Sequence, residues 1–60
     1  MTYMFIILHT GKKAFRINVN HIISYYTITT ASSKTNVVNL DNGTTMYVEE
    51  TAEEIDKIIF

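Results

Sequence analysis

The stretch from Asn36 to Phe60 places the strongest constraint on what this chain can fold into. It predicts a β-hairpin whose second strand runs directly into a short helix at the end of the sequence. A helix of about nine residues does not persist alone in water. We therefore expect it to dock on one face of the hairpin.

The pattern of apolar and polar side chains favours one of two possible hairpin loops. A two-residue Asn42-Gly43 turn would mix apolar and polar residues on each face. A three-residue loop from Asp41 to Gly43, with Gly43 left-handed, sorts them, and a one-residue slip would undo the sorting. The predicted register opposes Leu40 to Thr44, Val38 to Met46 and Asn36 to Val48. It gives an apolar face of Val38, Leu40, Met46 and Val48, and an opposite face that includes Val37 and Tyr47.

The helix has a local start signal and an apolar stripe. Thr51 followed three residues later by Glu54 predicts a capping box. Ile55, Ile58 and Ile59 share one helical face, because residues three and four apart are neighbours on a helix. We expect this stripe to pack on the apolar face of the hairpin.

The first strand is predicted from Tyr3 to Leu8, which is apolar at every position. Such a strand is either covered on both sides or located at a subunit interface. Gly11 lies in the turn that follows, and the return strand runs from Ala14 to Ile17. Its Phe15 and Ile17 point one way and Arg16 the other. The register of this hairpin stays open, because the first strand has no alternation to test.

A long third strand is predicted from His21 to Thr30 by its β-branched and aromatic content. Regular alternation would place Ile22, Ser24, Tyr26 and Ile28 on one face, and Ile23, Tyr25, Thr27 and Thr29 on the other. The predicted fold class is therefore α+β, a single domain over residues 1–60. It is a small, mostly antiparallel five-stranded sheet in the order β-β-β-β-β-α, with one C-terminal helix packed on one face.

Length and hydrophobicity together favour a homodimer. A 60-residue chain buries only about 60% of its unfolded surface. The chain has no cysteine, yet 47% of its residues are hydrophobic. Two copies that share a core would reconcile these facts.

Charge is distributed unevenly over a net charge of −1. Residues 1–34 carry Lys12, Lys13, Arg16 and Lys34 without an acid, whereas residues 35–60 carry six acids and Lys57. This pattern indicates two solvated faces with complementary dimer contacts. The alternative is an acidic helix that meets a basic partner.

Catalysis and metal binding find little support in the residues. His9 and His21 have no cysteine, no helical ligand spacing and no carboxylate placed beside them by sequence. Glu49, Glu50, Glu53 and Glu54 surround a helix start, where capping and solvation explain them; a role in partner binding is the alternative. We expect a non-enzymatic protein without catalytic, metal or cofactor site.

The tyrosines are the better indication of function. Tyrosine buries a ring while keeping a polar tip, and it is enriched at energetic hot spots of interfaces. Tyr25 and Tyr26 point to opposite faces, so a single-layer sheet cannot bury both. The residues predicted to form a dimer or partner interface are Tyr3, Phe5, Ile7, Tyr25, Tyr26, Tyr47, Glu50 and Glu53.

Other partners and locations follow from what the sequence offers. Nucleic-acid binding is unlikely, because Lys12, Lys13 and Arg16 beside Phe15 are only a faint basic and aromatic patch. No apolar run reaches the 18 or so residues that cross a bilayer. The sequence therefore predicts a cytoplasmic protein, and its richness in Asn, Thr, Ile, Lys and Tyr points to a bacterium or a phage-infected host cell.

Three segments resemble the small flagellar FlbD-like proteins, whose like are also found as short phage and mobile-element proteins. They read T-G-K-K-A-F-R-I-N-V-N-H-I-I, T-N-V-V-N-L-D-N-G and Y-V-E-E-T-A-E-E-I-D-K-I-I. The resemblance covers roughly residues 5–59. It departs at Ser33-Lys34-Thr35, where the family has Pro-Asp-Thr. The matched positions are Gly11, Phe15, Asn18, Ile22, Leu40, Gly43, Val48, Glu50 and Glu54. The resemblance implies the same fold and a flagellar accessory role.

The leading functional hypothesis is a homodimeric protein-binding module that docks on a larger host protein and modulates or inhibits it, in the manner of phage effectors. The alternatives are an FlbD-like flagellar accessory protein and a nucleic-acid-binding regulator.

Overall fold

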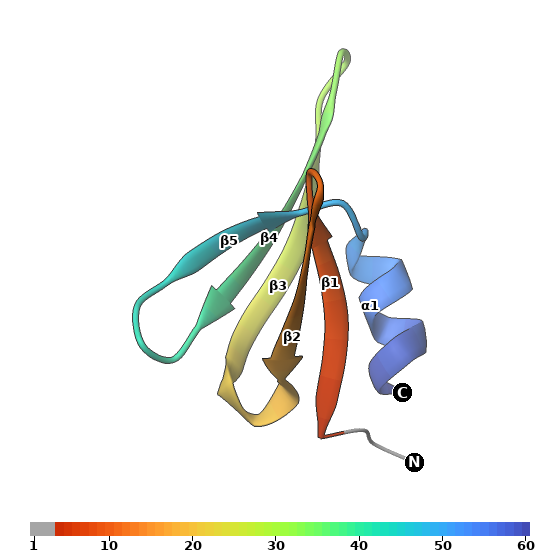
Figure 1. Cartoon of the computed structure of the whole chain (residues 1–60). Helices are drawn as coiled ribbons and strands as arrows, with labels where there is room; N and C mark the ends of the chain where they lie inside the picture. Colours follow the sequence, from red (N-terminus) through yellow and green to blue (C-terminus); the bar gives the residue numbers. More distant parts are fainter. Residues whose placement is uncertain (1–3) are drawn as a thin grey trace.

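The computed structural model describes residues 4–60, so Tyr3, predicted at an interface, lies outside the described residues. The predicted α+β class with five antiparallel strands and a C-terminal helix is confirmed (Figure 1). The elements are β1 (Phe5–Thr10), β2 (Lys13–Asn18), a 3-10 turn η1 (Val19–His21), β3 (Ile22–Thr29), β4 (Lys34–Leu40), β5 (Thr45–Val48) and α1 (Ala52–Ile59).

The strands form two sheets, β1-β2 and β3-β4-β5, so the single five-stranded sheet expected from the sequence is not confirmed. The nearest link between the sheets is at the end of β5, where the Glu49 amide donates to the His9 carbonyl oxygen at 2.8 Å. This one bond does not continue into a ladder. The β1-β2 hairpin instead lies across the larger sheet, with α1 beside it (Figure 1).

The β4-β5 hairpin has the predicted register. Val38 lies opposite Met46 and Asn36 lies opposite Val48. The Leu40 amide donates to the Thr44 carbonyl oxygen at 2.9 Å. Gly43 has a φ of +86°, as the three-residue loop requires.

Helix α1 begins at the predicted capping box. The Thr51 hydroxyl accepts from the Glu54 amide at 3.2 Å, and the Glu54 carboxylate accepts from the Thr51 amide at 3.1 Å. Ile55 and Ile59 are buried, and Ile58 packs at the margin of the core. Within residues 4–60, no helix is long and apolar enough to cross a membrane.

The core lies between the two sheets and the helix, and β1 contributes two of its buried side chains. Ile6 and Leu8 are buried, whereas Phe5 and Ile7 are exposed. The uniformly apolar first strand is therefore covered on one side only. The buried cluster is Ile6, Leu8, Val38, Val48, Ile55 and Ile59, with Leu40 and Met46 partly buried against it.

The register of the β1-β2 hairpin is set by a two-residue turn. Gly11 has a φ of +61°, and Thr10 pairs with Lys13 across the turn. Ile7 pairs with Arg16 and Leu8 with Phe15, so Phe15 and Arg16 point to opposite faces, as predicted.

A β-bulge in β3 makes the predicted assignment of Ile22 to a face of the sheet wrong. The register shifts between Ile22 and Ser24, so that Ile22 pairs with Leu40 while Ser24 pairs with Asn39. The extra residue, Ile23, breaks the alternation. Ile22 therefore packs against the core together with Tyr25, and not on the face of Ser24 and Tyr26.

Candidate protein-binding surface

The face of β3-β4-β5 turned away from α1, which we call the outer face, exposes large apolar side chains. Tyr26, Val37 and Tyr47 form one cross-strand row, as the pairing of Tyr47 with Val37 predicted. Tyr26 is 45% and Tyr47 65% exposed, and Ile28 beside them is 48% exposed. Val37 is buried although it does not belong to the core cluster, since cross-strand neighbours on both sides flank it.

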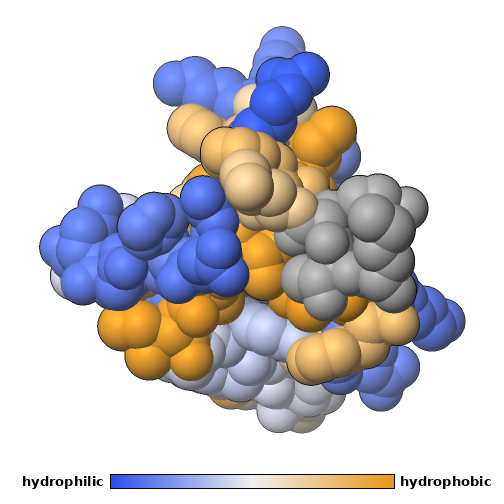
Figure 2. Space-filling view, turned by 90° about the horizontal axis from the view of Figure 1, so that it is seen from below, coloured by the Kyte–Doolittle hydropathy of each residue, from blue (hydrophilic) through white to orange (hydrophobic). Residues whose placement is uncertain are grey.

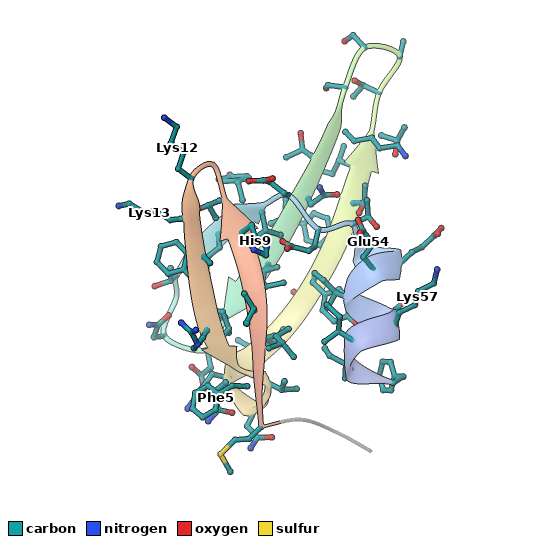
Figure 3. The ribbon with its side chains drawn as sticks, turned by 45° about the vertical axis from the view of Figure 1, so that its right-hand side comes forward. Phe5, His9, Lys12, Lys13, Glu54 and Lys57 are labelled. Atoms are coloured by element: carbon teal, nitrogen blue, oxygen red, sulfur yellow. The ribbon has the colours of Figure 1, made fainter. Side chains whose placement is uncertain are left out.

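A second apolar patch lies on β1. Phe5 and Ile7 are about half exposed and point away from the core. Phe5 lies at the end of β1 opposite the Lys12 and Lys13 tip (Figure 3). Seen from below, hydrophobic residues reach the surface between hydrophilic ones (Figure 2). Two of the predicted interface residues are thus available on this hairpin.

Tyr25 serves the fold of this chain. It lies on the inner face, partly buried, and its hydroxyl donates to the Asp56 carboxylate of α1. This hydrogen bond, with burial and the carboxylate charge, raises the pKa of Tyr25 above its usual range. Tyr25 therefore fixes the helix to β3, and Tyr26 is the member of the pair that faces outward.

Glu50 also has an internal partner. Its Oε1 accepts from the His9 amide at 2.9 Å, and its Oε2 lies 2.5 Å from His9 Nδ1. The hydrogen bond to Glu50 raises the pKa of His9. Burial opposes ionisation of Glu50, but the hydrogen bonds from the His9 amide and ring outweigh it and lower the pKa of this carboxyl. The sequence places no carboxylate beside His9, and the fold supplies one from 41 positions away.

His21 has a carboxylate partner as well. Its Nδ1 lies 2.7 Å from Asp41 Oδ2, and the Asp41 amide donates to the His21 carbonyl oxygen at 2.9 Å. These contacts join η1 to the end of β4. Within the described residues, no group of three or more histidine, cysteine or acidic side chains is arranged to hold a metal ion.

A groove of about 460 Å³ lies between β3 and the start of α1. Three of the predicted interface residues line it, namely Tyr25, Tyr26 and Glu53. The residues that line it are Tyr25, Tyr26, Thr27, Thr29, Lys34, Thr51, Ala52 and Glu53. Sequence spacing could not indicate this groove, because it joins two segments separated by more than twenty positions.

The basic residues do not gather on one face with the aromatic ones. Lys12 and Lys13 lie at the tip of the β1-β2 hairpin (Figure 3). Arg16 shares the outer side of that hairpin with Ile7, whereas Phe15 is on the other side with Leu8.

Comparison of the chain with models of protein families, with curated proteins and with solved structures found no match.

Proposed function

We propose that this chain is a non-enzymatic, homodimeric protein-binding module that docks on a larger protein of a bacterial or phage-infected cell and modulates or inhibits it. The observation that supports this most is the outer face, where Tyr26, Ile28 and Tyr47 are each 45% exposed or more. Exposed apolar groups gathered on one face are typical of protein interaction sites.

The internal contacts of the other polar candidates narrow the proposed binding surface to the outer face. Glu50 is engaged by His9 and Tyr25 by Asp56, so these residues hold the fold together. Tyr26 and Tyr47 have no side-chain hydrogen bond among the described residues. Their hydroxyl groups are available to a partner, and tyrosine is enriched among the anchors of interfaces.

The experiment is affinity purification of the tagged full chain from a bacterial lysate, followed by mass spectrometry. The wild type is compared with Tyr47→Ser, which removes the most exposed ring of the outer face, and with Thr45→Ser as a control on the same strand. We expect a stoichiometric partner with the wild type and the control that is lost with Tyr47→Ser. A partner retained equally by all three chains would contradict the proposal.

The same purification separates the other two candidates. An FlbD-like accessory role, which rests on the sequence resemblance alone, would give flagellar components as the partner. A regulator would bring down nucleic acid, and its binding would weaken steeply with salt.

A further inference from the structure

β3 is an edge strand, and the edge that faces away from β4 carries backbone groups that form no hydrogen bond within the sheet. The Thr30 amide bonds to the Ser33 carbonyl oxygen at 2.8 Å, which fixes the phase of the β3-β4 ladder. In an antiparallel ladder, hydrogen-bonded and non-bonded pairs alternate. The amides and carbonyls of Tyr25, Thr27 and Thr29 therefore point away from β4.

The β4-β5 hairpin gives the same phase independently. The Leu40 amide bonds to Thr44 of the β5 side, so Val38, two residues before Leu40, also directs its backbone groups to β5. Val38 is the partner of Tyr25 in the β3-β4 register. Among the described residues, no backbone hydrogen bond outside the ladder reaches Tyr25, Thr27 or Thr29.

The groove described above runs along this edge. Its lining includes Tyr26 from the outer face of β3, and Tyr25, Thr27 and Thr29 from the inner face. A groove lined by both faces of one strand lies over the edge of that strand. Unpaired strand edges are templates for another strand.

We propose that a second copy of this chain occupies the groove, with its own β3 antiparallel to the first and the two-fold axis at Thr27. This inference rests on the homodimeric part of the proposed function and specifies its geometry. Thr27 would pair with Thr27 of the second copy, Tyr25 with its Thr29, and Thr29 with its Tyr25. These three pairs use the backbone groups that point away from β4 and give six backbone hydrogen bonds.

The side chains of β3 are complementary in this register. Tyr26 lies opposite Ile28 of the second copy, on the outer face, where both are about half exposed in the single chain. Aromatic and β-branched residues are favourable cross-strand partners. The dimer would thus form a six-stranded sheet with one continuous outer face.

Charge fits a second copy as well. Lys34 pairs with Thr29 on the side of the sheet that carries α1, and Glu53 lies at the helix start. The two-fold axis brings the Thr29 level of one copy to the Tyr25 level of the other, beside its α1. Lys34 of each copy therefore lies at the level of Asp56 of the other, the carboxylate to which Tyr25 donates. The helix start itself lies at the level of Thr27, whose hydroxyl accepts from the Ala52 amide at 2.9 Å.

The register is tested by disulfide formation, because the chain has no cysteine of its own. Tyr26→Cys and Ile28→Cys are prepared as separate full-length variants, mixed and oxidised. We expect a disulfide-linked heterodimer in the mixture and little linked dimer with either variant alone, because residues 26 and 28 face each other only between copies. A linked dimer of equal yield in the single-variant samples, or none in the mixture, would overturn the proposed register.

A second test removes the edge hydrogen bonds without a cysteine. Thr29→Pro deletes an amide that points out of the ladder, and Thr29→Val keeps it as the matched control. We expect Thr29→Pro to raise the dimer Kd about tenfold or more, because two interchain bonds are lost. Equal Kd values by analytical ultracentrifugation would overturn the proposal.

Failure of the edge pairing is distinguishable from failure of the proposed function. Tyr47→Ser, on β5, is added to each of the two cysteine variants. The resulting chains should no longer bind the larger partner protein (the client) but should still form the disulfide between positions 26 and 28. A chain that captures its client through Tyr47 but gives no such disulfide would keep the binding function and reject this dimer.

Discussion

The two faces of the β3-β4-β5 sheet both carry large apolar groups, but those of the inner face are buried in the core and the largest ones of the outer face are exposed. Val38 on the inner face is completely buried, whereas Tyr47 on the outer face is 65% exposed. The inner face is covered by Ile55 of α1 and Leu8 of β1, and the described residues provide no second layer for the outer face. The difference teaches that what packs on a strand, and not the hydrophobicity of the strand, determines which face forms the core.

Truncation of the inner cover should have the largest effect. Ile55→Ala shortens a side chain at the centre of the core that is only 1% exposed. We expect a loss of about 3 kcal/mol, which is comparable with the whole stability of roughly 3–9 kcal/mol expected for a chain of this size. Urea denaturation followed by circular dichroism measures it. Ile58→Ala, at the margin of the core, should lose clearly less; equal losses would mean that the helix does not pack as described.

Changing the turn that sorts the two faces should have the next largest effect. Gly43 has a φ of +86°, and a Cβ there would touch nothing within 4 Å, so the cost of Gly43→Val lies in the backbone alone. We expect about 1–2 kcal/mol, measured by thermal unfolding. Gly43→Asn should be milder, because asparagine tolerates the left-handed region. A Gly43→Val chain as stable as the wild type would remove the argument for the three-residue loop.

The His9 and Glu50 pair should make the free energy of unfolding of the chain depend modestly on pH. The raised pKa of His9 means that its contribution is complete below the usual value of 6.5 and is lost as the pH rises through the raised value. The lowered pKa of Glu50 means that its contribution is complete above 4.5 and is lost as the pH falls. Both contributions coincide between about pH 4.5 and 6.5.

We therefore expect a higher urea midpoint at about pH 5.5 than at about pH 8. The effect should be smaller than that of Gly43→Val, because the His9 side chain is 51% exposed and solvent screens the pair. Glu50→Gln should abolish most of the difference. A midpoint difference that survives in Glu50→Gln would assign the pH dependence to other groups.

Changes on the outer face should have the smallest effect on stability. Tyr47→Ser removes an exposed ring that is the cross-strand neighbour of Val37, and we expect the free energy of unfolding to fall by no more than about 1 kcal/mol. The same urea experiment measures it. A much larger loss would show that the outer face contributes to the fold of the single chain, and the comparison of the two faces would fail.

The sequence predicted best what depends on neighbouring residues. The β4-β5 register and the Gly43 loop follow from alternation around one turn, and the helix start follows from Thr51 and Glu54, three residues apart. Such features are determined within a few positions. They are confirmed in detail.

Contacts between distant segments could not be predicted from the sequence. Glu50 meets His9 across 41 positions, and no local pattern signals this pair. The first strand has no alternation, so nothing in the sequence distinguished buried Ile6 and Leu8 from exposed Phe5 and Ile7. The candidate surface was predicted in part, because the position of Tyr47 follows from the hairpin register, whereas the groove beside Tyr26 depends on where α1 packs.

The bulge in β3 has a consequence for how this chain could change in length. Ile22 pairs with Leu40, and Ile23 is the unpaired extra residue, 68% exposed. Loss of one codon from this isoleucine doublet would still leave an isoleucine opposite Leu40 and a regular ladder from Ser24 onward. This position is therefore where related chains one residue shorter could arise without disturbing the fold.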